Sequence, residues 1–159
     1  MNTMEATVIE RRKCMTLLAA SLTAFGLLLG GCGESDSTGT TVNADLREFS
    51  IELDRSSAPA GKVTFLVQND GEDVHELVVL KTDIAPDKLP LNGDGDADEE
   101  AQGIVVLGEV EDIAPGKSGE LTLELDRGKY VIICNISMLE DGVVEHHYPL
   151  GMYTGFTVE

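Results

Sequence analysis

Short apolar stretches with a two-residue period run along most of the chain and constrain its fold more than any other feature. Apolar residues recur at every second position at 49–53, 63–67, 121–125 and 130–134, while 77–80 and 104–107 are continuous apolar runs. Such short runs, separated by glycine- and proline-containing turns, are typical of half-buried strands. Together with a last strand at 153–159, they predict an all-β Greek-key sandwich or barrel of about seven to eight strands.

The first 31 residues have the composition of an export signal. A basic cluster at 11–13 precedes an apolar run at 14–29, and small residues then lead to Cys32. The run is too short, and too rich in glycine at its end, for a comfortable membrane span. It predicts a signal over 1–31, and the pair Arg11-Arg12 leaves the twin-arginine route open beside the general one.

The segment Leu29-Gly30-Gly31-Cys32 resembles the lipobox of bacterial and archaeal lipoproteins. This resemblance implies cleavage before Cys32, a lipid on Cys32, and an exported protein anchored in the periplasm or at another extracytoplasmic membrane face. An uncleaved hydrophobic anchor that ends in cysteine is the alternative. The polar Gly/Ser/Thr-rich composition that follows predicts a flexible tether at 32–43 and a folded domain at 44–159.

The chain is strongly acidic, with 11 basic and 29 acidic residues and a net charge of −18. This charge argues against nucleic acid and against anionic membrane surfaces as partners, so membrane attachment is expected through the lipid alone. A basic partner protein, divalent cations or a salty habitat would each suit it, and so would solubility alone. The segment 83–103 contains the acidic run 94–100 and predicts a solvated surface insertion, because its aspartate spacing departs from the calcium-loop pattern at Glu99 and Val105.

One cysteine remains for the folded domain, since Cys14 lies in the signal and Cys32 at the lipid site. Without a disulfide partner, the thiol of Cys134 is expected to be buried or bound. Strand alternation directs Cys134 and His75 into the core at strand ends, and therefore to one pole of a sandwich. The loop after Cys134 can deliver further ligands there. The histidines and methionines available in it are His146, His147, Met138 and Met152.

Two imidazoles, a thiolate and a weak thioether form the ligand set of a mononuclear type 1 copper site. The chain resembles the cupredoxin family, of the plastocyanin and sulfocyanin type. The resemblance is carried by these segments: Val74-His75-Glu76, Gly128-Lys129-Tyr130, Cys134 and His147-Tyr148-Pro149-Leu150-Gly151-Met152. It implies one Cu(I)/Cu(II) ion bound by these residues: His75, Cys134, His147 and Met152.

The spacing of His147 and Met152 matches the family and selects them over His146 and Met138. We expect His146 to face solvent and Met138 to lie in the loop. One departure from the simplest members is the gap of 13 positions between Cys134 and His147. Two neighbours are assigned supporting roles: Tyr130 as a packing residue of the tyrosine-corner kind, and Asn135 through backbone hydrogen bonds.

The resemblance implies a lipid-anchored, monomeric one-electron carrier with His147 as the electron entry and exit. Its redox partner, such as a cytochrome or an oxidase subunit, would present a basic docking surface. A copper storage or delivery module with the same ligands is the alternative. An enzyme is not expected, because a multicopper oxidase needs more than three histidines and a binuclear centre needs two site cysteines.

Overall fold

The computed structural model describes residues 39–140 and 142–159. The predicted signal, the lipidated Cys32 and most of the predicted tether lie outside the described residues. Within the described part, no helix combines the length and hydropathy that crossing a membrane would require.

Four strands form the first sheet, in the order β2-β1-β4-β7. Their bounds are Thr40–Arg47 for β1, Ser50–Leu53 for β2, Gly61–Asn69 for β4 and Ser118–Leu125 for β7. β1 runs parallel to β4, and the other neighbours are antiparallel. The first strand starts at Thr40, so residues 40–43 belong to the sheet rather than to the predicted tether. They join it because Val42 continues the buried side of the strand formed by Ala44 and Leu46.

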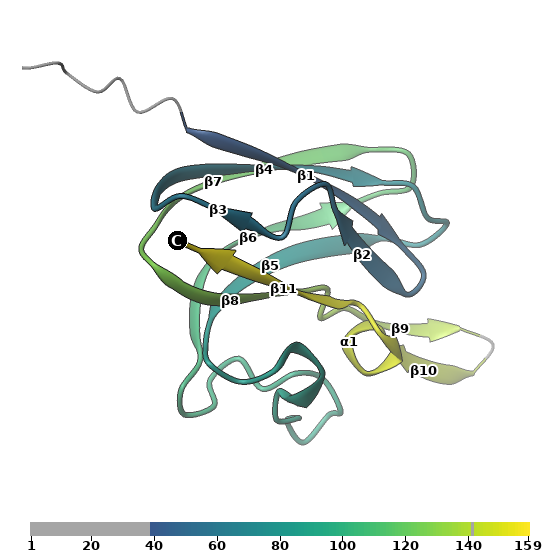
Figure 1. Ribbon diagram of the computed structural model, residues 1–159. Helices are drawn as coiled ribbons and strands as arrows, with labels where there is room; N and C mark the ends of the chain where they lie inside the picture. Colours follow the sequence, from purple (N-terminus) through teal and green to yellow (C-terminus); the bar gives the residue numbers. More distant parts are fainter. Residues whose placement is uncertain (1–38, 141) are drawn as a thin grey trace, which may run out of the picture. The chain divides into compact units, whose positions relative to one another are not determined.

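Five strands form the second sheet, in the order β3-β11-β8-β5-β6. Their bounds are Ser57–Ala58 for β3, His75–Lys81 for β5, Val105–Ile113 for β6, Gly128–Ile133 for β8 and Tyr153–Val158 for β11. The two sheets stack face to face (Figure 1) and bury one apolar cluster between them. Phe65 of β4 meets Phe156 of β11 edge to face, with 5.6 Å between ring centroids. The predicted all-β sandwich is confirmed.

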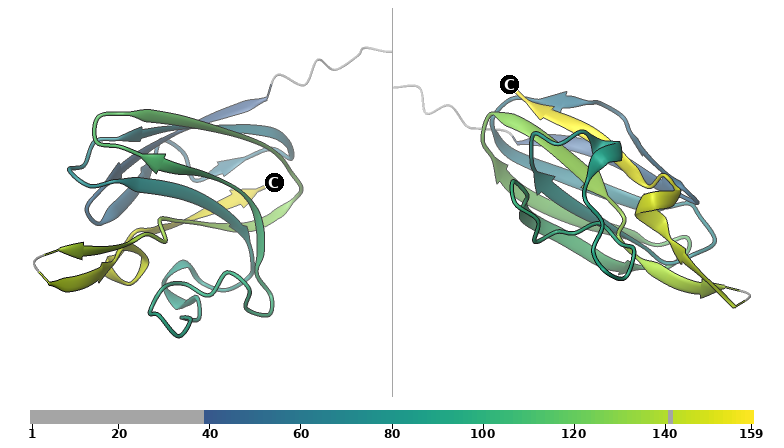
Figure 2. Two further views of the ribbon diagram at one scale, coloured as in Figure 1. Left: turned by 180° about the vertical axis from the view of Figure 1, so that it is seen from behind. Right: turned by 90° about the horizontal axis from the view of Figure 1, so that it is seen from below.

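The chain between Cys134 and His147 forms a hairpin of β9 (Ser137–Glu140) and β10 (Val143–His146). The short helix α1 (His147–Leu150) follows it directly. The hairpin projects from the end of the sandwich in both views of Figure 2. The long gap between Cys134 and His147 is therefore folded, in its described residues, as an extension of the sandwich.

The segment 83–103 is a surface insertion, as predicted, but it is not simply solvated, because it also covers the outer face of the second sheet. It contains the 3-10 helix η1 (Pro86–Lys88) and lies below β5 and β8 in Figure 1. Its buried residues Leu89 and Ala97 join a second apolar cluster with the outer side chains of those strands. The physical reason is that β5 and β8 are apolar on both faces, so each face needs a cover. These outer side chains are Val78, Leu80, Val131 and Ile133.

Candidate metal centre

Three buried side chains converge at one end of the sandwich: His75, Cys134 and His147. The Nδ1 atoms of the two histidines are 3.2 Å apart. The Sγ atom of Cys134 lies 3.4 Å from Nδ1 of His147 and 3.8 Å from Nδ1 of His75. For a triangle with these sides, the point equidistant from the three atoms lies about 2 Å from each, close to the bond lengths of imidazole and thiolate ligands to a metal.

The register of the second sheet brings the first two of these residues together. β5 runs antiparallel to β8 with Val78 opposite Ile133, so the start of β5 faces the end of β8. His75 is the first residue of β5 and Cys134 follows the last residue of β8. The backbone N–H of Glu76 donates to Sγ of Cys134 over 3.4 Å, which fixes the sulfur beside the strand.

The hairpin returns the chain to the same place, because its two ends are joined by hydrogen bonds. The backbone N–H of His147 donates to the carbonyl of Ile136 at 2.9 Å. The hairpin therefore brings His147 back beside the end of β8, although His147 and Cys134 are 13 positions apart in the sequence. Among the predicted ligands, His147 rather than His146 has its ring in the cluster, as the motif spacing indicated.

Met152 is fully buried and held by backbone bonds to two of the three residues. Its N–H donates to the carbonyl of His147, and its carbonyl accepts from the N–H of Cys134, each at 3.1 Å. Its role as fourth ligand stays a prediction. Met138 lies half-buried in β9, on the hairpin.

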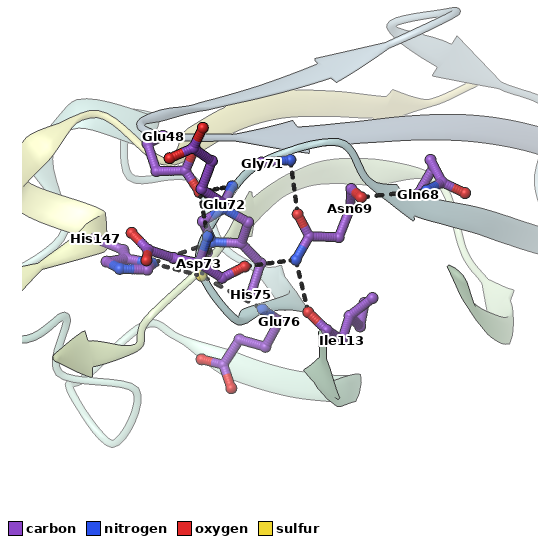
Figure 3. A network of polar contacts seen from close by, with 11 residues as sticks. Glu48, Gln68, Asn69, Gly71, Glu72, Asp73, His75, Glu76, Ile113 and His147 are labelled. Atoms are coloured by element: carbon purple, nitrogen blue, oxygen red, sulfur yellow. Dashed lines mark hydrogen bonds and ion pairs between the residues drawn. The ribbon is translucent and has the colours of Figure 1, made fainter. Parts of the chain in front are cut away.

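The two histidine rings have different surroundings. Nε2 of His75 lies 2.9 Å from Oε1 of Glu48, and that oxygen also accepts the backbone N–H groups of Glu72 and Asp73 (Figure 3). The ring of His147 packs against Phe49, edge to face, with centroids 5.3 Å apart. Its Nε2 is buried, and no described residue pairs with it. The sequence did not single out Glu48 or Phe49, because they belong to the turn between β1 and β2 and reach the site only through the stacking of the sheets.

Burial sets the protonation of the cluster. It raises the pKa of the Cys134 thiol to about 12, outweighing the N–H bond from Glu76. Burial and the neighbouring His75 lower the pKa of His147. Desolvation works against the Glu48 carboxylate, but hydrogen bonds from the Asp73 and Glu72 backbones outweigh it and lower its pKa. Without a metal the centre therefore holds a neutral thiol and a neutral His147.

The insertion 83–103 is bonded to the residues next to the cluster. Oδ1 of Asn135 accepts the backbone N–H of Ala97 at 2.8 Å, and its Nδ2 donates to the Ala97 carbonyl and to Glu99. The backbone N–H of Asn135 donates to Oε1 of Glu76 at 2.9 Å. Asn135 thus bridges β5, the insertion and the cysteine through its side chain as well as its backbone.

Contrary to the prediction, His146 does not face solvent. Its Nδ1 lies 2.8 Å from Oδ1 of Asp96 and 2.7 Å from the hydroxyl of Ser137, which also contacts that carboxylate. Both partners meet the same ring nitrogen, so this trio lacks the arrangement of a Ser-His-Asp nucleophile, in which serine and aspartate bind opposite nitrogens. The trio joins the acidic insertion to the hairpin. The sequence did not indicate this contact, because Asp96 and His146 lie fifty positions apart.

Tyr130 is buried, and its hydroxyl donates to the carbonyl of Asp126 at 2.6 Å. This is the bond of a tyrosine corner, to the backbone a few residues upstream, as the sequence indicated.

No family model and no curated protein sequence matches the chain. Among solved structures, dithionite-reduced auracyanin from Roseiflexus castenholzii matches with a TM-score of 0.51 and 20% identity, over 76% of this chain and 98% of auracyanin. Reduced rusticyanin matches with a TM-score of 0.51 and 18% identity, over 77% and 81% of the two chains. Rusticyanin from Thiobacillus ferrooxidans gives 0.50 and 15%, over 77% and 79%. The chain has the cupredoxin fold.

Proposed function

We propose that this protein is a type 1 copper protein that carries single electrons. The observation that carries the proposal is the buried triangle formed by Nδ1 of His75, Sγ of Cys134 and Nδ1 of His147. Two imidazoles and one thiolate are the strong ligands of such a site, and we assign Met152 as the weak thioether ligand. Rusticyanin, which has the same fold, is a copper protein. The bound ion would supply one-electron chemistry by alternating between Cu(II) and Cu(I).

The protein's own contribution is a rigid and dry set of donors. All four residues are fully buried, and backbone bonds tie Cys134, His147 and Met152 to one another. Because the pKa of the Cys134 thiol is raised to about 12, the thiol must release its proton when it binds a metal. Donors that are already in place need little rearrangement when the charge of the site changes. Such a buried site suits electron transfer better than the binding of a substrate, and we propose no enzymatic activity.

We keep His147 as the proposed entry and exit for the electron. Its ring has no exposed surface, so an electron would tunnel across the side chains that cover the ring. Phe49 is one of these side chains. Exposed apolar side chains gather on the neighbouring hairpin and on α1. Their exposed fractions are 74% for Leu139, 63% for Val143, 51% for Val144 and 49% for Leu150.

We propose a monomer that docks a redox partner with a basic surface, such as a cytochrome or an oxidase subunit. The net charge of −18 would steer such a partner, so association should weaken as salt is added. We also propose export and anchoring through a lipid on Cys32, on the basis of the lipobox resemblance.

The test is to add Cu(II) to the purified protein and to record its visible spectrum and its redox cycling. An intense thiolate-to-Cu(II) band that bleaches and returns reversibly is expected. Cys134→Ser should abolish the band, and a band that survives this change would refute the ligand assignment. Binding of Cu(I) without such a band would favour copper storage or delivery over electron transfer.

A further inference from the structure

The carboxylate of Glu48 is built into the metal centre from the opposite sheet. Oε1 lies 2.9 Å from Nε2 of His75 and accepts two backbone N–H groups, from Glu72 at 2.9 Å and Asp73 at 2.8 Å. These three contacts enclose one oxygen, although the side chain of Glu48 is still 25% exposed. A Cβ on Gly71 would collide with this carboxylate, so a larger residue at position 71 would displace it.

This arrangement fixes which nitrogen of His75 carries the proton. An oxygen that accepts two backbone N–H groups acts toward the ring as an acceptor as well, so Nε2 must be the donor. In a neutral imidazole the other nitrogen is then bare. That nitrogen is Nδ1, the atom that faces Sγ of Cys134 and Nδ1 of His147. The bond to Glu48 thus prepares the lone pair that a metal needs.

The second histidine shows that this support is specific. His147 has no polar partner at Nε2 among the described residues, and its ring packs edge to face against the rings of Phe49 and His75. The two ligands therefore differ in the charge placed behind them. A carboxylate behind a ligating imidazole makes the ring a stronger donor, which favours the more highly charged state of a bound metal.

We propose that Glu48 is a positioning residue of the metal centre, which holds His75 in its Nε2–H tautomer and lowers the reduction potential of the site. The effect on the potential rests on the proposed copper function. The effect on the tautomer does not, because it concerns the protein alone.

The tautomer is tested on the metal-free full-length protein by ¹⁵N NMR of the His75 ring. The wild type should show one tautomer, with the proton on Nε2. Glu48→Gln keeps an oxygen acceptor and should preserve this tautomer, whereas Glu48→Ala should give a mixture. Unchanged ring shifts in Glu48→Ala would overturn the proposal, and rescue by glutamine separates the hydrogen bond from a general loss of folding.

The potential is tested on the copper-loaded protein by redox titration. Glu48→Gln should favour Cu(I) over Cu(II) about tenfold relative to wild type, a rise of about 59 mV for a one-electron couple. The matched control is Glu72→Gln, which removes an exposed charge of the same sign nearby but keeps the backbone donor. Equal shifts of the reduction potential in the two variants would show that Glu48 acts only through its charge and not through its hydrogen bond to His75. A wild type without the thiolate band would refute the copper function, while the NMR result would still decide the role of Glu48.

Discussion

The metal centre is supported by two regions that reach it in different ways. The turn between β1 and β2 touches the histidines themselves, through Glu48 on His75 and Phe49 on His147. The insertion 83–103 touches the sequence neighbours of the proposed ligands, at Asn135, His146 and Tyr148. The difference indicates a division of labour. Changes in the turn should alter the properties of the centre, and changes in the insertion should alter how firmly the ligand loop is held.

The largest effect should separate a histidine of the centre from the histidine that contacts the insertion. His75→Gln removes a proposed ligand and should abolish the visible copper band and reduce the copper affinity by more than the 10- to 100-fold typical of a lost supporting contact. His146→Gln, the matched change in the contact with the insertion, should leave the band in place. Copper titration followed by visible absorption measures both. Loss of the band in both variants would contradict the proposal that His75 binds the metal and that His146 does not.

Phe49→Ala tests the apolar half of the turn. It removes a partly buried ring that packs on His147 and on the main core cluster, and should lower the free energy of unfolding by about 2–4 kcal/mol. Phe49→Leu, which keeps most of the volume, should cost about half as much. Chemical denaturation of the metal-free protein gives these values. Equal stability of the alanine variant and the wild type would show that the turn does not brace His147.

Asn135→Ala tests the strongest link to the insertion. The change leaves the buried N–H of Ala97 without its acceptor, which should cost about 1–3 kcal/mol. Copper should also pass faster to an added chelator, because the residue after Cys134 is freed. Asn92→Ala is the control, since the Asn92 side chain caps a turn wholly inside the insertion. Equal chelator rates in the two variants would mean that the insertion does not restrain the ligand loop.

Asp96→Asn should have the smallest effect. It removes the charge from the partly buried contact with His146 but keeps an oxygen acceptor there, so the free energy of unfolding should fall by about 1 kcal/mol or less. The copper spectrum should be unchanged, and added salt should alter the loss of stability only weakly because the contact is partly buried. A spectral change would show that the hairpin transmits this contact to His147, which follows His146 directly.

The sequence predicts those strands whose apolar pattern can be recognised within a few neighbouring residues. Period-two runs located strands β2, β4 and β7, which have one buried face, but Val42 follows a Thr/Gly-rich segment, so the first half of β1, residues 40–43, was assigned to the tether. The apolar runs of β5 and β8 are buried on both faces, and their sequences do not indicate which segment of the chain covers the outer face. The cover came from the insertion, whose acidic composition indicated solvent.

The same limit applies to the centre. Cysteine and histidine are uncommon metal-binding residues whose type and spacing can be recognised in the sequence, and the predicted His75, Cys134 and His147 do converge. Glu48 and Asp96 give no such signal, because each is one of many acidic residues until the fold places it against a histidine. Their partners lie 27 and 50 positions away. Only the registers of the sheets and the path of the insertion bring them together.

The position of β11 has a consequence for the order of assembly. This strand follows the ligand loop in the chain, yet it lies inside the second sheet, between β3 and β8. Until it pairs, β8 has a free edge and the carbonyl of Met152 is not yet fixed against Cys134. β11 pairs with β8 across only 20 to 30 positions, whereas the pairing of β5 with β8, which brings His75 to Cys134, spans 49 to 55 positions. Pairings between distant segments form more slowly than local ones. We therefore expect Cys134, His147 and Met152 to be assembled first, and His75 to join them later in folding.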